Sequence, residues 1–171
     1  MKNIILTGFM GTGKSTAGKL TADALNYDFV DTDEAIMLKA GQTVAQIFES
    51  QGEDAFRAME HDLAVELSER SSLVISTGGK MMLDTENVRL LGRNGWIFCL
   101  TASPEEIIER ISRDRTIKRP LLDVADPPRR IRELLGSRKK GYEKFMQIDT
   151  TSKTPEMICE KILSLFKSGI R

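Results

Sequence analysis

Short apolar runs alternate along the chain with longer segments in which apolar residues recur every three or four positions. The runs cover residues 3–7, 28–31, 73–77, 96–100 and 146–150. Runs of this length are typical of strands, and the segments between them, such as 62–70 and 104–111, have the spacing of helices. Five strands separated by helices predict an α/β fold in which helices cover both faces of a parallel sheet, a three-layer α/β/α arrangement.

Length and charge limit the organisation and the partners. At 171 residues and 40% hydrophobic, the chain suits a single domain over residues 1–171. The 25 basic and 25 acidic residues cancel, which provides no net field for nucleic acid or an anionic membrane. The apolar run before Gly8 is too short for a signal peptide or for the roughly 20 residues of a membrane span. We therefore expect a cytoplasmic monomer that binds neither nucleic acid nor membrane.

The segment GFMGTGKST, residues 8–16, carries the clearest chemical signal. It lies between the first strand and the first helix and matches the pattern G-x-x-x-x-G-K-[ST]. Glycines let backbone N–H groups turn inward around phosphate oxygens, and the helix N-terminus adds its positive end. Lys14 would reach the β and γ phosphates, and Ser15 would ligate Mg²⁺. The segment predicts a nucleoside triphosphate site formed by Gly11, Thr12, Gly13, Lys14, Ser15 and Thr16.

Two carboxylates follow the second predicted strand, in FVDTDEA. Asp31 and Asp33 stand two residues apart, so their side chains project from the same face while the strand persists. Asp31 would hold the water shell of Mg²⁺, and Asp33 would accept a proton from a substrate hydroxyl. The alternative is that one of them caps the following helix, which is common for Asp before a helix.

Motifs along nearly the whole chain together resemble those of the shikimate kinase family. In order they are GFMGTGKST, FVDTD, AQIFESQGEDAFRAME, ISTGG, KRPLL and an arginine four residues before a tyrosine that leads to IDT. The second and third separate this family from gluconate kinases and nucleoside monophosphate kinases, which share the first. The resemblance implies a P-loop kinase with a five-stranded parallel sheet in the order 2-3-1-4-5. It also implies a helical substrate-binding region at about residues 33–62 and a lid at about residues 112–127.

The resemblance assigns roles at the acceptor side of the site. Arg57 would bind the carboxylate of shikimate with its planar guanidinium, and Arg138 would be the second carboxylate-binding arginine. Glu60, three residues after Arg57 on the same helical face, would orient it. Gly78 and Gly79 would let the acceptor approach the backbone, because they have no side chain.

On the nucleotide side, the resemblance adds residues outside the glycine-rich loop. Lys14 and Arg119 would stabilise charge on the transferring phosphoryl group while Asp33 assists deprotonation of the acceptor. Arg113, or alternatively Arg110, would stack on adenine, with Pro155 near the other side of the base. Residues 112–130 contain six basic residues and three prolines with little periodicity, which we interpret as a mobile flap that is disordered in the empty enzyme.

Lys80 departs from the family, which usually has a third glycine at this position. It either points to solvent or places a positive charge near the shikimate carboxylate or the transferring phosphate. The expected activity is ATP- and Mg²⁺-dependent phosphorylation of the 3-hydroxyl of shikimate, in the route to chorismate and aromatic amino acids. The alternatives are a kinase for another polyol acid such as gluconate, and a non-catalytic nucleotide-binding relative that regulates a partner.

Overall fold

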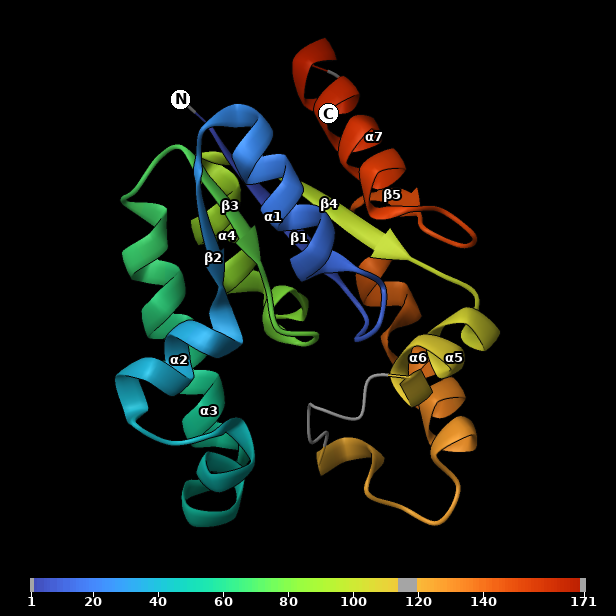
Figure 1. Cartoon of the computed structure of the whole chain (residues 1–171). Helices are drawn as coiled ribbons and strands as arrows, with labels where there is room; N and C mark the ends of the chain where they lie inside the picture. The colour runs from blue at the N-terminus through green and yellow to red at the C-terminus, as the bar shows by residue number, and fades with distance from the viewer. Residues whose placement is uncertain (1, 114–119, 170–171) are drawn as a thin grey trace.

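A five-stranded parallel sheet forms the middle layer of the molecule (Figure 1). The computed structural model describes residues 2–113 and 120–169. In chain order, the strands are β1 (Asn3–Gly8), β2 (Asp28–Asp31), β3 (Leu73–Ser76), β4 (Gly95–Thr101) and β5 (Met146–Asp149). Their order in the sheet is β2-β3-β1-β4-β5. The expected strands and the order 2-3-1-4-5 are therefore confirmed.

Helices cover both faces of the sheet (Figure 1). They are α1 (Lys14–Leu25), α2 (Thr32–Ala40), α3 (Val44–Ser68), α4 (Thr85–Arg93), α5 (Pro104–Arg113), α6 (Pro127–Tyr142) and α7 (Pro155–Ser168), with short 3₁₀ turns η1 (Met81–Leu83) and η2 (Pro120–Leu122). Helices α1 and α7 lie side by side on one face, and α3 to α6 supply the other layer. Within the part of the chain that the structure describes, no helix has both the length and the apolar character that a membrane crossing needs.

Alternate residues of β1 face opposite layers. Ile4 and Leu6 are fully buried in a cluster with residues of α1 and α7, among them Ala17 and Ile158. Ile5, between them, is fully buried in a second cluster that residues of α3, α4, α5 and α6 share. Burial on both faces explains why the strands read as continuous apolar runs and not as an alternation of apolar and polar residues.

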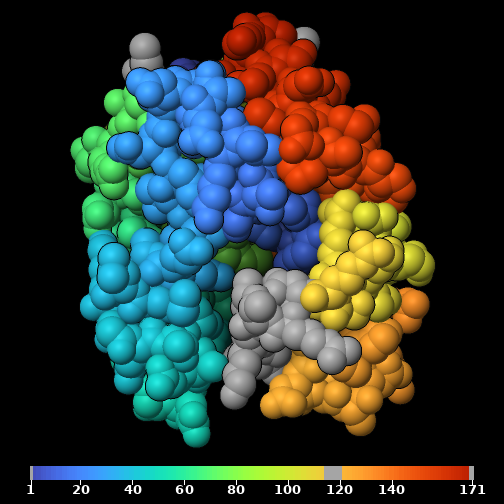
Figure 2. All heavy atoms as spheres, in the orientation of Figure 1, coloured from blue at the N-terminus to red at the C-terminus, as the bar shows by residue number. Residues whose placement is uncertain are grey.

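The carboxyl ends of β1, β2 and β3 meet at one edge of the sheet. Ser76 pairs in register with Leu6 of β1 on one side and with Asp31 of β2 on the other. Figure 2 shows the α2–α3 region in cyan and the α5–α6 region in yellow and orange on opposite sides of the lower half of this face. Ligands of α/β sheets bind at the carboxyl ends of the strands, so this edge is where a site is expected.

Two expectations about element boundaries are wrong in detail. Strand β2 ends at Asp31, and Asp33 belongs to the first turn of α2, so the two carboxylates do not share one strand face. Helix α6 begins at Pro127 and is capped by Asp126, which shortens the irregular stretch expected over 112–130. Prolines suit the first turn of a helix, and composition alone does not separate them from prolines in a loop.

Candidate active site

The loop between β1 and α1 adopts backbone conformations that require glycine. Gly8 has φ 130°, and a Cβ atom there would lie 2.2 Å from the carbonyl oxygen of Leu100. Gly13 has φ 87° and directly precedes the first residue of α1. With these two glycines the chain turns sharply from the strand into the helix and presents the helix N-terminus at the sheet edge, which is an arrangement suited to phosphate.

Lys14 lies across this loop. Its Nζ donates hydrogen bonds of 2.9 Å to the carbonyl oxygens of Gly8 and Phe9. Burial lowers the pKa of Lys14, while Asp33 and Asp31 oppose that shift. The loop therefore holds a buried cation close to two carboxylates, and the expected contact of Lys14 with the β and γ phosphates stays a prediction.

Asp31 caps α2, which is one of the two alternatives raised from the sequence, and it also contacts Ser15; its role toward Mg²⁺ stays a prediction. Its Oδ1 accepts hydrogen bonds from the backbone N–H groups of Asp33 and Glu34, at 3.1 and 3.4 Å, and so caps α2. Its Oδ2 accepts a hydrogen bond of 2.7 Å from the hydroxyl of Ser15, which lies 3.2 Å from the hydroxyl of Ser76. Carboxylate and hydroxyl oxygens at the end of a phosphate-binding loop are ligands that suit Mg²⁺, so the residues fit the ion.

Asp33 and Glu60 direct unpaired oxygens toward the same small space. A Cβ atom at Gly78 would lie 2.6 Å from Asp33 Oδ1 and 2.8 Å from Glu60 Oε1. Neither oxygen has a hydrogen-bond partner among the residues described, although both are buried. Burial raises the pKa of Asp33 to about 6 and that of Glu60 to about 7. Buried polar atoms are rarely left unpaired, so these two oxygens indicate a place for a polar ligand group.

The turn after β3 is held by two residues that the sequence reasoning missed. The N–H of Gly78 donates a 2.9 Å hydrogen bond to the buried hydroxyl of Thr32. The hydroxyl of Tyr142 donates to the carbonyl oxygen of Gly79. The available signals were the threonine between the two aspartates of FVDTD and a tyrosine one helical turn after Arg138, but a spacing does not reveal which backbone group a side chain reaches.

Arg57 lies on α3 between two glutamates. Its Nη1 donates a 2.6 Å hydrogen bond to Glu60 Oε2, which confirms the expected pairing. Its Nε and Nη2 donate to Glu53 Oε1 at 3.2 and 2.9 Å. The guanidinium also lies over the rings of Phe48 and Phe56, 5.9 and 5.3 Å from their centroids. These contacts hold Arg57 in place from three sides.

The side chain of Lys80 is 41% exposed, and it pairs with a glutamate that neither alternative named. Its Nζ donates a 2.8 Å hydrogen bond to Glu53 Oε1, the same oxygen that Arg57 contacts. Glu53 was not among the expected site residues, because an exposed glutamate on a helix is common and its partner comes from a turn 27 positions away. Glu53 therefore links Lys80 to Arg57.

Arg138 is a buried cation beside Gly79, the residue that follows Gly78 in the turn. It is 5% exposed, and its guanidinium lies 5.4 Å from the centroid of the Phe9 ring. A Cβ atom at Gly79 would lie 3.0 Å from its Nη1. Within the described ranges, its Nε has no hydrogen-bond partner. A buried arginine with an unpaired N–H group is suited to an anionic ligand.

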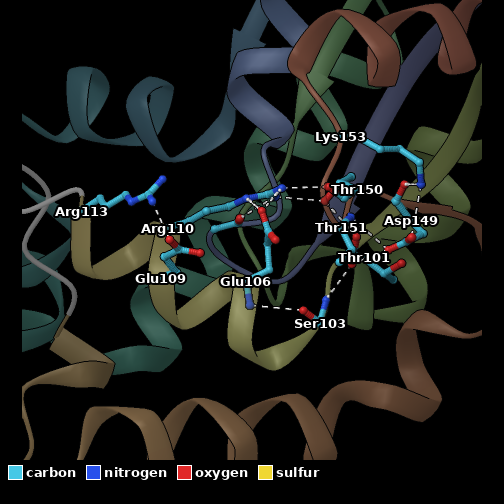
Figure 3. A network of polar contacts seen from close by, with 11 residues as sticks. Thr101, Ser103, Glu106, Glu109, Arg110, Arg113, Asp149, Thr150, Thr151 and Lys153 are labelled. Carbon is cyan, nitrogen blue, oxygen red and sulfur yellow. Dashed lines mark hydrogen bonds and ion pairs between the residues drawn. The ribbon is translucent and has the colours of Figure 1, made fainter.

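Helix α5 brings Arg110 to the glycine-rich loop (Figure 3). Arg110 Nη1 donates to the carbonyl oxygen of Gly11 at 3.3 Å, and its Nη2 donates to the carbonyl oxygen of Thr150 at 2.8 Å. Arg113 lies one turn further along and pairs with Glu109, with 76% of its side chain exposed. Of the two arginines expected near adenine, Arg110 has the contacts with the loop.

Pro155, the first residue of α7, lies beside the start of α1. It lines a pocket of about 340 Å³ together with Ser15, Thr16 and Lys19. The expected nucleotide residues Pro155, Ser15 and Thr16 are thus brought together. Arg119, expected to act on the transferring phosphoryl group, lies outside the described residues.

Comparisons of the sequence and of the structure with known proteins find shikimate kinases. The profile of the family described as Shikimate kinase matches residues 10–167. A shikimate kinase from Thermodesulfovibrio yellowstonii is 45% identical over 168 residues, which are 98% of this chain and 96% of that protein. The solved structure of shikimate kinase from Acinetobacter baumannii in complex with shikimate has a TM-score of 0.91 at 35% identity, covering 99% of this chain and 95% of that one. A gluconokinase from Sinorhizobium meliloti, with a TM-score of 0.65 at 16% identity over 98% of this chain and 92% of that one, shares the fold alone.

Proposed function

Because the chain belongs to the shikimate kinase family, we propose that it transfers the γ-phosphoryl group of ATP to the 3-hydroxyl of shikimate. The products are shikimate 3-phosphate and ADP, in the biosynthesis of chorismate and aromatic amino acids. The observation that carries this proposal is the pair of unpaired oxygens of Asp33 and Glu60, which face one space beside Arg138 and the glycine-rich loop. A hydroxylated carboxylic acid supplies the donors and the anion that this space lacks.

The acceptor is held from two sides. Arg57 and Arg138 bind its carboxylate, and Glu60 orients Arg57 through the contact between Oε2 and Nη1. Because Gly78 and Gly79 have no side chain, Asp33, Glu60 and Arg138 come close to the backbone of the turn, where we expect the acceptor to bind. Asp33 binds the 3-hydroxyl. Its pKa of about 6 places this carboxylate near the range in which a group is both ionised at neutral pH and able to accept a proton.

Transfer then follows the general logic of phosphoryl transfer. The 3-oxygen forms a bond to the γ-phosphorus as the bond from that phosphorus to the bridging oxygen of ADP breaks, and the hydroxyl proton passes to Asp33. Backbone groups of residues 11–16 hold the phosphates, and Lys14 and Arg119 stabilise the charge on the transferring group. Ser15 and Asp31 would hold Mg²⁺, which would supply further neutralisation of phosphate charge.

At the adenine end, we assign the stacking role to Arg110 with Pro155 on the other side of the base. The bonds of Arg110 to Gly11 and Thr150 support this assignment over one to Arg113. The helical region over residues 33–62 would bind the acceptor, and residues 112–127 would form the lid. The monomeric state and the cytoplasmic location stay predictions.

A coupled assay of ADP release with Mg²⁺ and ATP tests the function. We expect release that depends on shikimate and is absent with gluconate or without acceptor. Release with gluconate alone would identify a kinase for another polyol acid. ADP release that is the same with and without an acceptor, from protein that binds ATP, would indicate hydrolysis of ATP by a nucleotide-binding relative that lacks the transfer activity.

A further inference from the structure

A row of alternating charges connects the turn after β3 to the carboxylate side of the acceptor site. Lys80 Nζ lies 2.8 Å from Glu53 Oε1, and Arg57 Nη2 lies 2.9 Å from the same oxygen. Arg57 Nη1 lies 2.6 Å from Glu60 Oε2. One oxygen of Glu53 therefore binds two cations at once, and Glu53 occupies the edge of Arg57 formed by Nε and Nη2.

A ligand carboxylate that binds Arg57 through two parallel hydrogen bonds needs a free edge of the guanidinium. Glu60, whose side chain is 1% exposed, occupies Nη1, and losing its partner would leave a buried charge unpaired. Glu53 has a side chain that is 44% exposed, so water solvates it readily after it leaves Arg57. Of the two glutamates, Glu53 is the one that a ligand can displace at low cost.

Lys80 lowers the free energy needed to displace Glu53 from Arg57. The hydrogen bond from Lys80 is the largest influence that lowers the pKa of Glu53, ahead of the bond from Arg57. Glu53 thus remains ionised and keeps a cationic partner when Arg57 is taken from it. Lys80 sits on the turn that also carries Gly78 and Gly79, so the same segment contacts the acceptor space and the displaced glutamate.

Building on the proposed function, we propose that Glu53 is an exchangeable internal carboxylate that occupies Arg57 until the carboxylate of the acceptor replaces it. Lys80 is the positioning residue that receives Glu53 during this exchange. The acceptor's carboxylate then gains an arginine that is already oriented by Glu60 and by the rings of Phe48 and Phe56. Lys80 acts through Glu53 and touches neither reacting group.

The test combines single and double variants in the ADP-release assay. Lys80→Ala should raise KM for shikimate about three-fold, the scale of one exposed ion pair, with kcat and KM for ATP unchanged. Lys80→Arg should restore the wild-type KM.

Glu53→Gln should lower KM for shikimate, because the amide competes less strongly for Arg57. In the Glu53→Gln background, Lys80→Ala should have no effect. Arg89→Ala, which removes an exposed cation paired with Glu86 on α4, outside the acceptor-binding region, is the control and should match wild type.

Several outcomes overturn the proposal. A Lys80→Ala variant with wild-type KM removes Lys80 from binding. If Lys80→Ala raises KM for shikimate equally in the wild-type and Glu53→Gln backgrounds, Lys80 acts on the substrate directly. A wild-type protein without shikimate-dependent release overturns the proposed function and this exchange with it, whereas an active wild type with an unchanged Lys80→Ala variant overturns the exchange alone. A carboxyl titration of Glu53 by NMR checks the pairing without substrate, and Lys80→Ala should raise the pKa of Glu53.

Discussion

At the scale of single residues, the site depends on carboxylates that the fold holds in a poorly solvated position. Burial is the largest influence on the pKa of both Asp33 and Glu60 and raises both. Lys14 and Arg57 lie close enough to lower the pKa of Asp33 in part. A carboxylate kept partly unpaired costs stability, and here the unpaired oxygens are those that face the proposed acceptor.

Asp33→Asn tests the proposed base. The amide keeps the size of the side chain and cannot accept the hydroxyl proton, so kcat should fall by about 100-fold or more. KM for ATP should stay within about two-fold of wild type, because no described contact of Asp33 is with the glycine-rich loop backbone. Steady-state ADP release measures both constants, and near-normal turnover would contradict the role of Asp33 as base.

The same substitution should reveal the cost of the buried charge. Because burial raises the pKa of Asp33 from 3.8 to about 6, the folded protein binds this proton more tightly than the unfolded chain does. The ionised carboxylate therefore lowers the free energy of unfolding above about pH 6, and this destabilisation disappears below about pH 4. Asp33→Asn should gain stability relative to wild type as pH rises through this window, by about 1 to 3 kcal/mol. Urea unfolding across the window measures the gain, and a gain that does not vary with pH would argue against the raised pKa.

Gly78→Ala tests the space between the carboxylates. The added methyl group would lie within 2.8 Å of oxygens of both Asp33 and Glu60, closer than real Cβ contacts, so the variant should lose about 1 to 3 kcal/mol and most of its activity. Gly136→Ala is the matched control, because a Cβ atom there meets nothing within 4 Å in the exposed face of α6. That control should gain about 0.5 kcal/mol in urea unfolding. A Gly78→Ala variant as active as Gly136→Ala would show that the space is not needed.

At the scale of elements, the helices decide which side chains reach the sheet edge. Helix α3 carries Glu53, Arg57 and Glu60 at spacings of four and three residues, which places them on one face. A break at Gly52, with φ 86° and ψ 172°, lets the first part of the helix take a different direction. Phe48 from before this break therefore contacts Arg57 from after it.

The position of helix α5 likewise determines which of two arginines, Arg110 or Arg113, contacts the glycine-rich loop. Arg110→Ala removes the bonds to Gly11 and Thr150 and should raise KM for ATP about ten-fold, the scale of one charged hydrogen bond. Arg113→Ala removes an exposed pair with Glu109 and should leave KM for ATP within about two-fold. Nucleotide titrations of the two variants measure the difference, and equal effects would contradict the assignment of Arg110.

At the scale of the whole molecule, the sheet edge joins two regions that are distant in sequence. Helix α3 supplies Arg57 and Glu60, and α6 supplies Arg138. The α2–α3 region and the α5–α6 region lie on opposite sides in Figure 2. A ligand that contacts both regions binds the folded chain and not the unfolded one, so it must stabilise the fold.

Thermal unfolding checks this coupling. Shikimate at about 100 times its dissociation constant should stabilise wild type by about 2.7 kcal/mol, seen as a rise in Tm, and gluconate at the same concentration should not. Arg57→Lys should lose most of this rise at equal shikimate, because an ammonium cannot reproduce the two parallel hydrogen bonds. A Tm shift that Arg57→Lys retains would show that the carboxylate is held elsewhere.

Local order in the chain was sufficient for the strands and the phosphate loop, whereas the sheet order came only from the resemblance to the family. The strands and the loop depend on near neighbours: apolar runs, a strand-to-helix junction, and the pattern ending in Lys14 and Ser15. The pairing of Arg57 with Glu60 was also predictable, since it follows from helical geometry over three residues.

Tertiary structure decided the contacts between segments. Asp33 faces Glu60 across Gly78 because the end of β2, helix α3 and the turn after β3 converge, and no spacing encodes that meeting point. The partner of Lys80 and the orientation of Arg110 depend likewise on where a turn or helix docks against a distant element. Periodicity reports which face of an element is buried, whereas the neighbour on that face is determined by packing of the complete chain.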